Sequence, residues 1–243
     1  ENGYKFYKKG GFVMSVSVAV LGGGNGAHAA AADLTYRGFN VHMYEDAHFA
    51  SNMQKVFDTR KILMAGAAGN AEVTLEMVTS DLAEAIEGVK YIFVAVPAFA
   101  HGTYAEKLAE VVHPGQIITI FAGSFDSLLF WKKLKERGIE DVIVTETNTL
   151  PYATRLRAPG DILVMSLFNP LKIGVMPACK TKETVEQLIQ FYPQLEAVES
   201  VIACWLSGLN PIIHVPGCIL NAGHIEQAKG DFYFYTEGFS SCV

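Results

Sequence analysis

The sequence predicts an α/β protein with a Rossmann-type, doubly wound parallel sheet, followed by the start of an all-helical domain. Three observations predict this class. Short β-branched apolar runs alternate with helical segments over most of the 243 residues, a glycine-rich turn joins the first strand to the first helix, and the pattern turns helical from about residue 201. Half of the residues are hydrophobic, and the chain is long enough to bury a sizeable core.

The first strand is predicted at residues 16–21, a β-branched run that ends in glycines. A helix over 25–37 follows, because the segment is rich in alanine and stops at Gly38. Apolar runs predict further strands at 41–44, 71–79, 91–96, 116–121, 142–145, 161–168 and 172–176, the last two closing the sheet. Helices are predicted at 47–60, 81–87, 101–112, 126–137 and 182–192.

The chain divides into three segments. Residues 1–13 are interpreted as a leader or a disordered extension, because Met14 opens the periodic part of the sequence. Residues 14–200 form the α/β domain. Residues 201–243 form the N-terminal part of a helical domain that these few residues leave incomplete.

The composition argues against several classes of partner and site. A net charge of −6 and an isoelectric point near 5.6 argue against a nucleic-acid-binding protein. No run of 18 apolar residues occurs, so a membrane span is not expected. The four cysteines are widely separated and show no CxxC or Cys/His spacing, which predicts a reduced, cytoplasmic setting and no metal site.

The turn after the first strand carries a G-x-G-x-x-A motif. Gly22 permits the tight turn, Gly24 lets the backbone approach a pyrophosphate, and Ala27 allows the helix to pack closely on the strand. The phosphates would bind at the N-terminus of the helix. About 20 residues downstream, Glu45 ends the second strand, where a carboxylate accepts the ribose hydroxyls. The predicted cofactor-binding residues of these two segments are Gly22, Gly24, Asn25, Gly26, Ala27 and Glu45.

The cofactor is predicted to be NAD or NADP, with NAD favoured. Glu45 and Asp46 would repel a 2′-phosphate, and no arginine follows them directly. The loop after the strand at 91–96 is expected to lie beside the cofactor, which adds Val96, Pro97 and Ala98 to the binding residues. For Phe99, in the same loop, ordinary packing and a cofactor contact are left open.

A second group of polar residues lies in the helical part. Asn210 and His214 are four residues apart in a strongly apolar segment and would share one helix face. A structural role for His214 is one reading, and an acid–base role beside a hydride acceptor is the other, because imidazole titrates near neutral pH. His214, His224 and Glu226 match no standard metal spacing.

The end of the strand at 142–145 leads into an unusually polar segment. Glu146 and Thr147 are candidates for substrate contact, with Glu146 able to receive a cationic group. Arg155 is a candidate for holding a carboxylate through two hydrogen bonds. A solvated loop with an ordinary salt bridge is the alternative.

These segments together resemble the opine dehydrogenase family, which includes the octopine and nopaline dehydrogenases. The resemblance spans nearly all of residues 14–243. It is carried by VLGGGNGAHAAA at 20–31, VAVPAFAHG at 94–102, ETNTLPYATR at 146–155, NPIIHVPGCILNAGHIE at 210–226 and GDFYFYTEG at 230–238.

The resemblance implies an oxidoreductase that joins a 2-oxo acid such as pyruvate to the amino group of an amino acid and reduces the imine with NADH or NADPH. It implies that the substrates bind between the Rossmann and helical domains. It also implies that His214 is the acid–base residue and that Glu146 lies in the substrate cleft, with Asn210 nearby.

The chain departs from the family pattern in two places. The family usually has a glycine-rich segment with an arginine where this chain reads FAGSFD at 121–126. The family's helical domain is also far longer than 201–243, so a large apolar patch would stay exposed and favour a homodimer. Two alternatives remain: a non-catalytic NAD(P)-binding remnant or sensor, or another Rossmann dehydrogenase of the 2-hydroxy acid, ketopantoate or glycerol-phosphate type.

Overall fold

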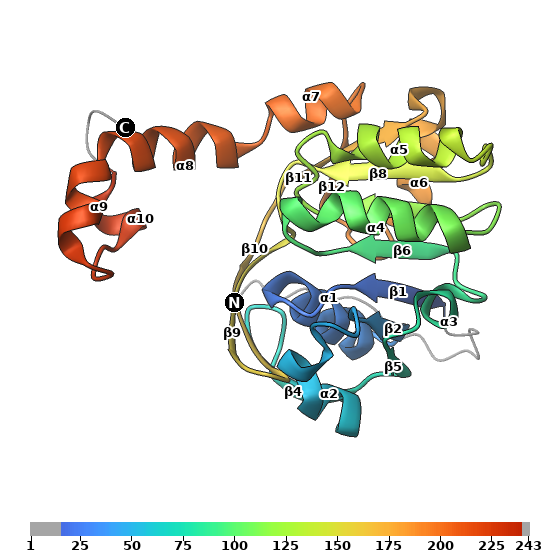
Figure 1. The fold of residues 1–243 in the computed structure, drawn as a ribbon, viewed down its shortest axis with the longest axis horizontal. Coiled ribbons are helices and arrows are strands. Elements are labelled where there is room, and N and C mark those ends of the chain that lie inside the picture. The colour runs from blue at the N-terminus through green and yellow to red at the C-terminus, as the bar shows by residue number, and fades with distance from the viewer. Residues whose placement is uncertain (1–15, 240–243) are drawn as a thin grey trace.

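The computed structural model describes residues 16–239, so the segment at 1–13 lies outside the described residues. The centre is an eight-stranded sheet in the order β12-β11-β8-β7-β6-β1-β2-β5 (Figure 1). Its strands are β1 (Ser17–Leu21), β2 (Asn40–Tyr44), β5 (Met77–Thr79), β6 (Tyr91–Val94), β7 (Ile117–Ile120), β8 (Ile143–Thr147), β11 (Leu171–Met176) and β12 (Leu195–Ala197). The strand order reverses between β1 and β6, and this is where ligands bind in open α/β sheets.

Helices cover both faces of this sheet, which confirms the doubly wound class. On one face, α3 (Leu82–Ile86), α4 (Ala98–Val111) and α5 (Asp126–Glu136) enclose a core with the strands. On the other face lie α1 (Asn25–Tyr36) and α6 (Thr181–Leu188). Shorter turns are η1 (Ala50–Met53), α2 (Gln54–Thr59) and η2 (Ala178–Lys180).

A second sheet, which the sequence analysis did not predict, packs on the outer side of α1. Its order is β4-β3-β10-β9, formed by β4 (Ala71–Thr74), β3 (Lys61–Gly66), β10 (Asp161–Leu167) and β9 (Tyr152–Ala158). Helix α1 is therefore enclosed by two sheets. This explains its run of alanines at 29–32, which are fully buried, because larger side chains would push the layers apart.

Three expectations about strands were wrong. The single strand at 71–79 is two strands in different sheets, because the chain turns at Leu75 and Glu76 from β4 into β5. The strands at 161–168 and 172–176 do not close one sheet together, since β10 pairs with β3 and β9 while β11 pairs with β8 and β12. The β11–β8 pairing is antiparallel, so the main sheet is parallel only as far as β8.

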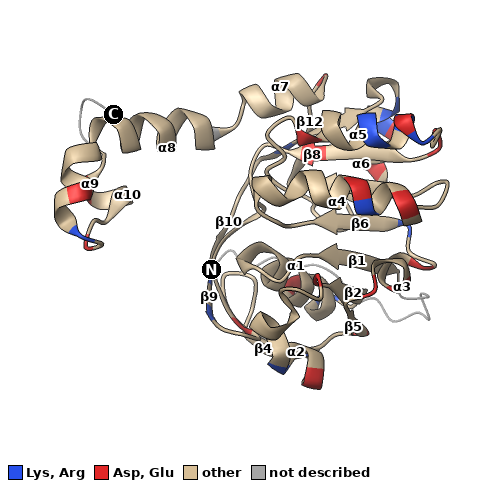
Figure 2. Ribbon diagram, in the orientation of Figure 1, with Lys and Arg blue, Asp and Glu red and all other residues tan. Residues whose placement is uncertain are grey.

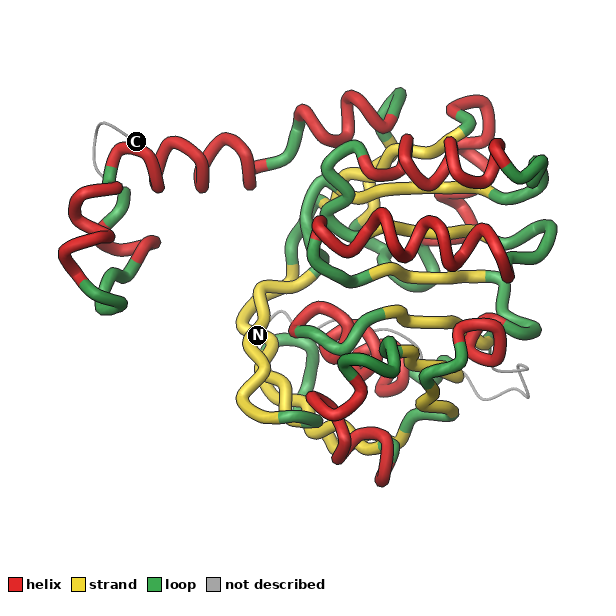
Figure 3. The backbone as a smooth tube through the Cα atoms, in the orientation of Figure 1, coloured by secondary structure: helices red, strands yellow, loops and turns green. Residues whose placement is uncertain are grey.

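Beyond the sheets, the chain forms a helical arm of α7 (Val201–Leu206), α8 (Leu209–Leu220), α9 (Ala222–Ala228) and α10 (Phe234–Glu237). Helix α7 packs on β8 and β11, whereas α8 leads away from the sheet (Figures 1 and 3). Figure 2 shows no charged residue on α7 or α8. Many apolar side chains of the arm are exposed: Ile202, Leu206, Ile212, Val215, Ile219, Leu220, Tyr233, Tyr235 and Phe239.

The stretch Val201–Leu220 is the one part of residues 16–239 that is long and apolar enough to cross a membrane by length and composition. The stretch is interrupted between α7 and α8, at Ser207 and Gly208. Its first helix is anchored in the α/β domain, since the Cys204 thiol donates to the carbonyl oxygen of Glu146 at 3.2 Å. The length criterion alone is weak evidence for a span.

A buried polar network ties α1 to the second sheet. The Asp33 carboxylate accepts two hydrogen bonds from Arg37, at 3.1 and 2.9 Å, and one from the Tyr152 hydroxyl at 2.8 Å. The Tyr152 hydroxyl also lies 3.3 Å from that of Tyr192. Burial raises the pKa of both tyrosines, so they stay neutral donors at physiological pH.

We predict that Tyr152→Phe lowers the free energy of unfolding by about 1.5–3 kcal/mol, because a charged, largely buried carboxylate loses a hydrogen bond. Urea denaturation measures the change. The control is Tyr36→Phe, on the exposed end of α1, which should change the free energy by less than about 0.5 kcal/mol. Equal effects of the two substitutions would contradict the importance of this network.

Candidate functional site

The glycine turn lies at the carboxyl end of β1 and fits closely against β6. Gly22 has a φ of +120°, and a Cβ there would lie 2.6 Å from the Ala95 carbonyl oxygen and 2.9 Å from a Val96 methyl group. A Cβ on Gly26 would lie 2.7 Å from Leu150. These glycines are needed for space. A Cβ on Gly24, in contrast, would meet nothing within 4 Å, so the backbone here is open to a ligand.

The first turn of α1 offers free backbone donors toward that open space. Gly24 is the N-cap, and no side chain caps the helix. The Asn25 side chain points elsewhere, since its Oδ1 accepts a hydrogen bond from the Leu156 backbone on β9. The arrangement suits an anion held by backbone N–H groups, with Asn25 contributing through its main chain.

The His28 side chain is hydrogen-bonded to this turn. Its Nδ1 lies 3.1 Å from the Gly24 carbonyl oxygen, and its Nε2 accepts from the Gly160 N–H at 3.4 Å. Burial lowers the pKa of His28, so the ring is neutral and the Nδ1–H donates to Gly24. The sequence analysis did not single out His28, because its partner on the β9–β10 turn is more than a hundred residues away.

Glu45 lies against the same turn. Its Oε1 accepts from the Asp46 N–H at 2.8 Å and from the Tyr104 hydroxyl at 3.3 Å. A Cβ on Gly23 would lie 2.3 Å from Oε2, so the carboxylate lies directly on the glycine turn. Burial raises the pKa of Glu45. Next to it, Asp46 forms an ion pair with Lys107 of α4.

The loop after β6 borders the turn through Val96. Pro97 is the N-cap of α4 and Ala98 is its first residue, both exposed. Phe99 is 88% exposed, so ordinary packing does not account for it in this structure. The helix begins at Ala98 and not at residue 101 as predicted, because Pro97 has a fixed φ that suits a position just before a helix.

His101 links this loop to the neighbouring one. It is buried, its Nδ1 lies 2.6 Å from the Asp126 carboxylate, and its Nε2 lies 3.1 Å from the Val96 carbonyl oxygen. Both ring nitrogens thus face acceptors. This contact fixes the starts of α4 and α5 relative to each other. The sequence analysis missed the pair, since two residues 25 positions apart on different helices leave no local pattern.

Glu146 is fully buried at the end of β8. Its Oε2 accepts from the Ser127 N–H at 3.1 Å, while its Oε1 has no hydrogen-bond partner among the described residues. Burial raises the pKa of Glu146. Desolvation and the nearby Glu146 likewise raise the pKa of Cys204 to about 12, so this thiol is not a nucleophile.

The segment 121–126, where the family pattern is glycine-rich, covers Glu146. A Cβ on Gly123 would lie 2.6 Å from the Glu146 Cβ. Ala122, Ser124 and Phe125 adopt left-handed backbone conformations, with φ of 54°, 53° and 72°. Each such residue costs about 1 kcal/mol, so the loop is strained at these three non-glycine positions.

The remaining substrate candidates are not brought together. The Thr147 hydroxyl donates to the Thr149 carbonyl oxygen at 2.7 Å and accepts from the Ala122 N–H at 3.2 Å, so it organises the loop. Arg155 lies exposed on β9, in the second sheet. The alternative reading of this polar segment as a solvated loop does not describe its end, because residues 152–155 belong to β9.

In the arm, α8 contains both Asn210 and His214, and Asn210 is exposed. His214 contacts aromatic residues of the arm itself: its Nε2 lies 3.3 Å from the Tyr235 hydroxyl, and its ring centroid lies 5.3 Å from that of Phe234. The structure therefore places His214 with α10 and not against the glycine turn.

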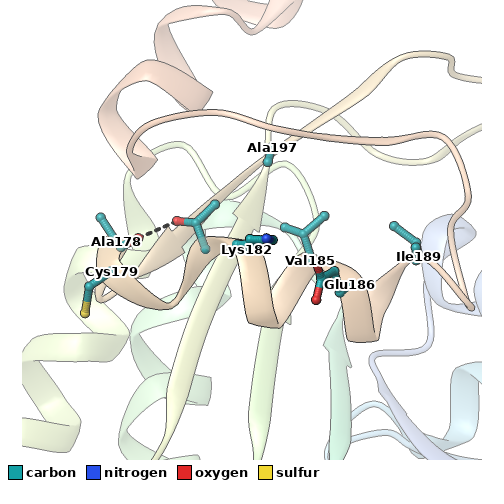
Figure 4. A pocket seen from close by; sticks show the side chains of 8 residues that line it. Ala178, Cys179, Lys182, Val185, Glu186, Ile189 and Ala197 are labelled. Atoms are coloured by element: carbon teal, nitrogen blue, oxygen red, sulfur yellow. Dashed lines mark hydrogen bonds between the residues drawn. The ribbon is translucent and has the colours of Figure 1, made fainter.

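A shallow depression of about 480 Å³ lies elsewhere, over α6 and β12 (Figure 4). Its lining is mostly apolar and includes Cys179, Val185 and Ile189. It is at the edge of the sheet, far in strand order from β1, and none of the predicted site residues lines it.

Two family models match separate parts of the chain. Residues 17–149 match the family model described as NAD-dependent glycerol-3-phosphate dehydrogenase N-terminus. Residues 197–243 match the model described as NAD/NADP octopine/nopaline dehydrogenase, alpha-helical domain. The fold and the glycine turn thus define a dehydrogenase-type Rossmann domain that continues into a helical segment.

Relatives narrow this class. An opine dehydrogenase of Arthrobacter sp. (strain 1C) is 30% identical over 95% of this chain and 64% of its own length. Two solved structures share the fold. One is an octopine dehydrogenase in complex with NADH and agmatine, with a TM-score of 0.66, 20% identity, and 87% of this chain and 55% of that one covered. The other is the apo form of yersinopine dehydrogenase, with a TM-score of 0.71, 16% identity, and 84% and 52% covered.

By its residues 17–149 the chain belongs to the family of NAD-dependent glycerol-3-phosphate dehydrogenase N-terminal domains. Its helical segment matches the octopine/nopaline dehydrogenase helical-domain model, and the chain is similar to opine dehydrogenases. It spans less than two thirds of the length of these relatives.

We predict that Glu146→Gln raises the free energy of unfolding at pH 7 by about 1–3 kcal/mol, because a buried charge with a free oxygen is replaced by a neutral amide. The folded-state pKa of Glu146 is raised, so its cost is absent below about pH 4.5, the ordinary value, and grows as the pH rises through the folded value. Denaturation at pH 7 and near pH 4.5 should therefore give a gain only at pH 7. Glu226→Gln, at an exposed position, is the control. A gain that is equal at both pH values would rule out this origin.

Proposed function

We propose that the protein is an NAD(P)H-dependent opine dehydrogenase, an oxidoreductase that acts on CH–NH bonds. It would condense a 2-oxo acid, such as pyruvate, with the amino group of an amino acid and reduce the resulting imine. One observation carries the proposal. An open glycine turn at the end of β1 and the buried Glu146 at the end of β8, whose Oε1 lacks a hydrogen-bond partner among the described residues, lie at the same edge of one sheet.

The proposed cofactor site consists of Gly22, Gly24, Asn25, Gly26, Ala27, Glu45, Val96, Pro97 and Ala98. The open backbone at Gly24 and the uncapped start of α1 fit a pyrophosphate. The Glu45 carboxylate, held on the turn by Tyr104, fits ribose hydroxyls and disfavours a 2′-phosphate. We therefore propose NAD as the preferred cofactor.

We predict that Glu45→Ser shifts the ratio of the NADPH and NADH dissociation constants toward NADPH by tenfold or more, because the repulsion of the 2′-phosphate and the ribose contact are lost together. Fluorescence titration with each nucleotide measures the ratio. Glu76→Ser, a surface substitution after β4, serves as the control. An unchanged ratio would show that Glu45 does not select the cofactor.

For the chemistry, the nicotinamide supplies a hydride when bound. His214 moves two protons from the ammonium nitrogen of the amino acid to the carbonyl oxygen of the 2-oxo acid, which leaves as water, and the C=N bond of the resulting iminium can then accept the hydride. Glu146 holds the amine, and Thr147 and Asn210 line the substrate cleft. Arg155 binds a substrate carboxylate. In this structure the His214 ring contacts Phe234 and Tyr235 of α10. The proposal therefore requires α8 to approach the sheet edge in the working enzyme.

The test is the consumption of NADH in the presence of pyruvate and a panel of amino acids. Loss of NADH absorbance that depends on the amino acid supports an opine dehydrogenase. NADH binding without turnover supports the non-catalytic remnant or sensor. Turnover with a 2-oxo acid alone supports the dehydrogenases of the 2-hydroxy acid or ketopantoate type, and turnover with dihydroxyacetone phosphate supports the glycerol-phosphate type.

We predict that His214→Ala lowers kcat by about 100-fold or more while the dissociation constant of NADH changes by less than twofold, because an acid–base group is removed at a distance from the cofactor turn. Steady-state kinetics and NADH titration separate the two effects. His224→Ala, at an exposed position in the same arm, should leave kcat unchanged. If NADH binding falls with kcat, His214 is structural.

We also propose that residues 14–200 form the NAD(P)-binding domain and that 201–243 begin the helical substrate domain of a cytoplasmic enzyme. The apolar, charge-free surface of α7 and α8 supports burial of this arm against protein, including a second copy of the chain. Light scattering would report such a homodimer as twice the 26.5 kDa of one chain. A chain that stays monomeric at all concentrations would contradict it.

A further inference from the structure

The strained loop over Glu146 is held at its outer end by the helical arm. Phe125, which precedes the first residue of α5, stacks on Trp205 of α7 with ring centroids 4.4 Å apart and planes at 26°. Both rings are half-buried, so they can separate into solvent. The stack joins the loop to the arm at a point where the Phe125 backbone is left-handed.

The two ends of the loop differ in how firmly they are fixed. At the inner end, Phe121 is buried in the core of the α/β domain. On the far side, the Asp126 carboxylate is fixed by the buried His101 at 2.6 Å. Between them, the Ala122 and Gly123 N–H groups donate to Thr147, and the Gly123 and Phe125 carbonyl oxygens accept from the first turn of α5. The Phe125–Trp205 stack is the contact that joins this segment to the arm.

The loop shields a polar atom that has no partner. Glu146 is fully buried, and its Oε1 accepts no hydrogen bond of good geometry within residues 16–239, although the Ser127 hydroxyl and the Phe125 N–H lie near enough to the carboxylate to lower its pKa in part. A buried carboxylate oxygen without a donor costs about 1–3 kcal/mol or more. A ligand with N–H donors would recover this cost, but Glu146 is fully buried and Gly123 lies against its Cβ and Oε2, so the loop has to move before a ligand reaches the carboxylate.

We propose that the Phe125–Trp205 stack is a latch that keeps the loop of residues 121–126 closed over Glu146, and that an ammonium ligand reaches Oε1 only when the stack opens. The inference rests on the proposed role of Glu146 in holding the amine substrate. It adds two positioning residues, which act through the loop and do not touch the substrate. It also makes access to the amine site depend on where α7 lies.

The backbone strain of the closed loop favours its opening. Three left-handed residues store free energy in the closed state, and this free energy is released when the loop changes conformation. The closed state therefore depends on contacts made outside the loop, of which the stack is the one that reaches the arm. Removing the stack should favour the open state.

The test uses the two tryptophans of the chain. In a Trp131→Phe background, Trp205 is the only fluorophore of its kind, and n-butylammonium chloride is the probe for the amine site. At constant ionic strength, we expect a saturable shift of the Trp205 emission as the stack opens. Tetramethylammonium, which carries the same charge without N–H donors, should give no shift, and Glu146→Gln should abolish the response.

Calorimetric titration with n-butylammonium then tests the latch itself. We expect Phe125→Ala to bind the probe about 2- to 10-fold more tightly than the parent, the range that an aromatic pair accounts for. Phe125→Tyr, which keeps the ring, should bind like the parent. Trp205→Ala should reproduce the gain of Phe125→Ala, and the double variant should add nothing further. If Phe125→Ala does not fold, Phe125→Gly, which tolerates the left-handed backbone, replaces it.

Unchanged or weaker binding in Phe125→Ala and Trp205→Ala would overturn the latch, as would the absence of a Trp205 response to n-butylammonium. NADH binding is measured on the same variants. If NADH binds normally while the latch tests fail, the latch is wrong and the proposed cofactor function stands. If n-butylammonium binds as expected while NADH does not bind, the proposed dehydrogenase function fails and the latch stands.

Discussion

The close approach of α1 to two sheets is the constraint on which the rest of the structure depends. The main sheet fixes the start of the helix through Gly22 and Ala27, and the second sheet presses on its outer side. His28 and Asp33 fasten the helix to the second sheet by hydrogen bonds from Gly160 and Tyr152. The backbone donors of the glycine turn are thus held from both sides, which is the preorganisation that anion binding needs.

The part of the sheet edge at the end of β8 carries several unfavourable contacts and conformations. There the chain places a buried carboxylate, a loop with three strained residues and an aromatic contact to a helix of the arm. Such costs persist only where the surroundings enforce them, and they gather at functional sites. The molecule therefore combines a rigid half at the proposed cofactor site with a strained half at the proposed substrate site.

The sequence predicted what local patterns can encode. The glycine motif and the β-branched strands each depend on neighbours within a few residues, and each appears as expected. The second sheet was missed, because it is joined through the pairing of β3 with β10, which lies about a hundred residues downstream. The His101–Asp126 pair and the Phe125–Trp205 stack escaped for the same reason. The position of His214 depends on how the arm packs, which no periodicity records.

The layered position of α1 has a consequence for folding. Its outer face is covered in part by β3 and β4 and in part by β9 and β10, which follow it by more than a hundred residues. A growing chain therefore leaves part of this helix face uncovered until residue 167 has been made. Only at that stage can the Gly160 N–H donate to His28, whose other ring nitrogen is hydrogen-bonded to the Gly24 carbonyl oxygen of the glycine turn. Competence to bind a nucleotide would then appear late and abruptly during synthesis, when the small sheet closes.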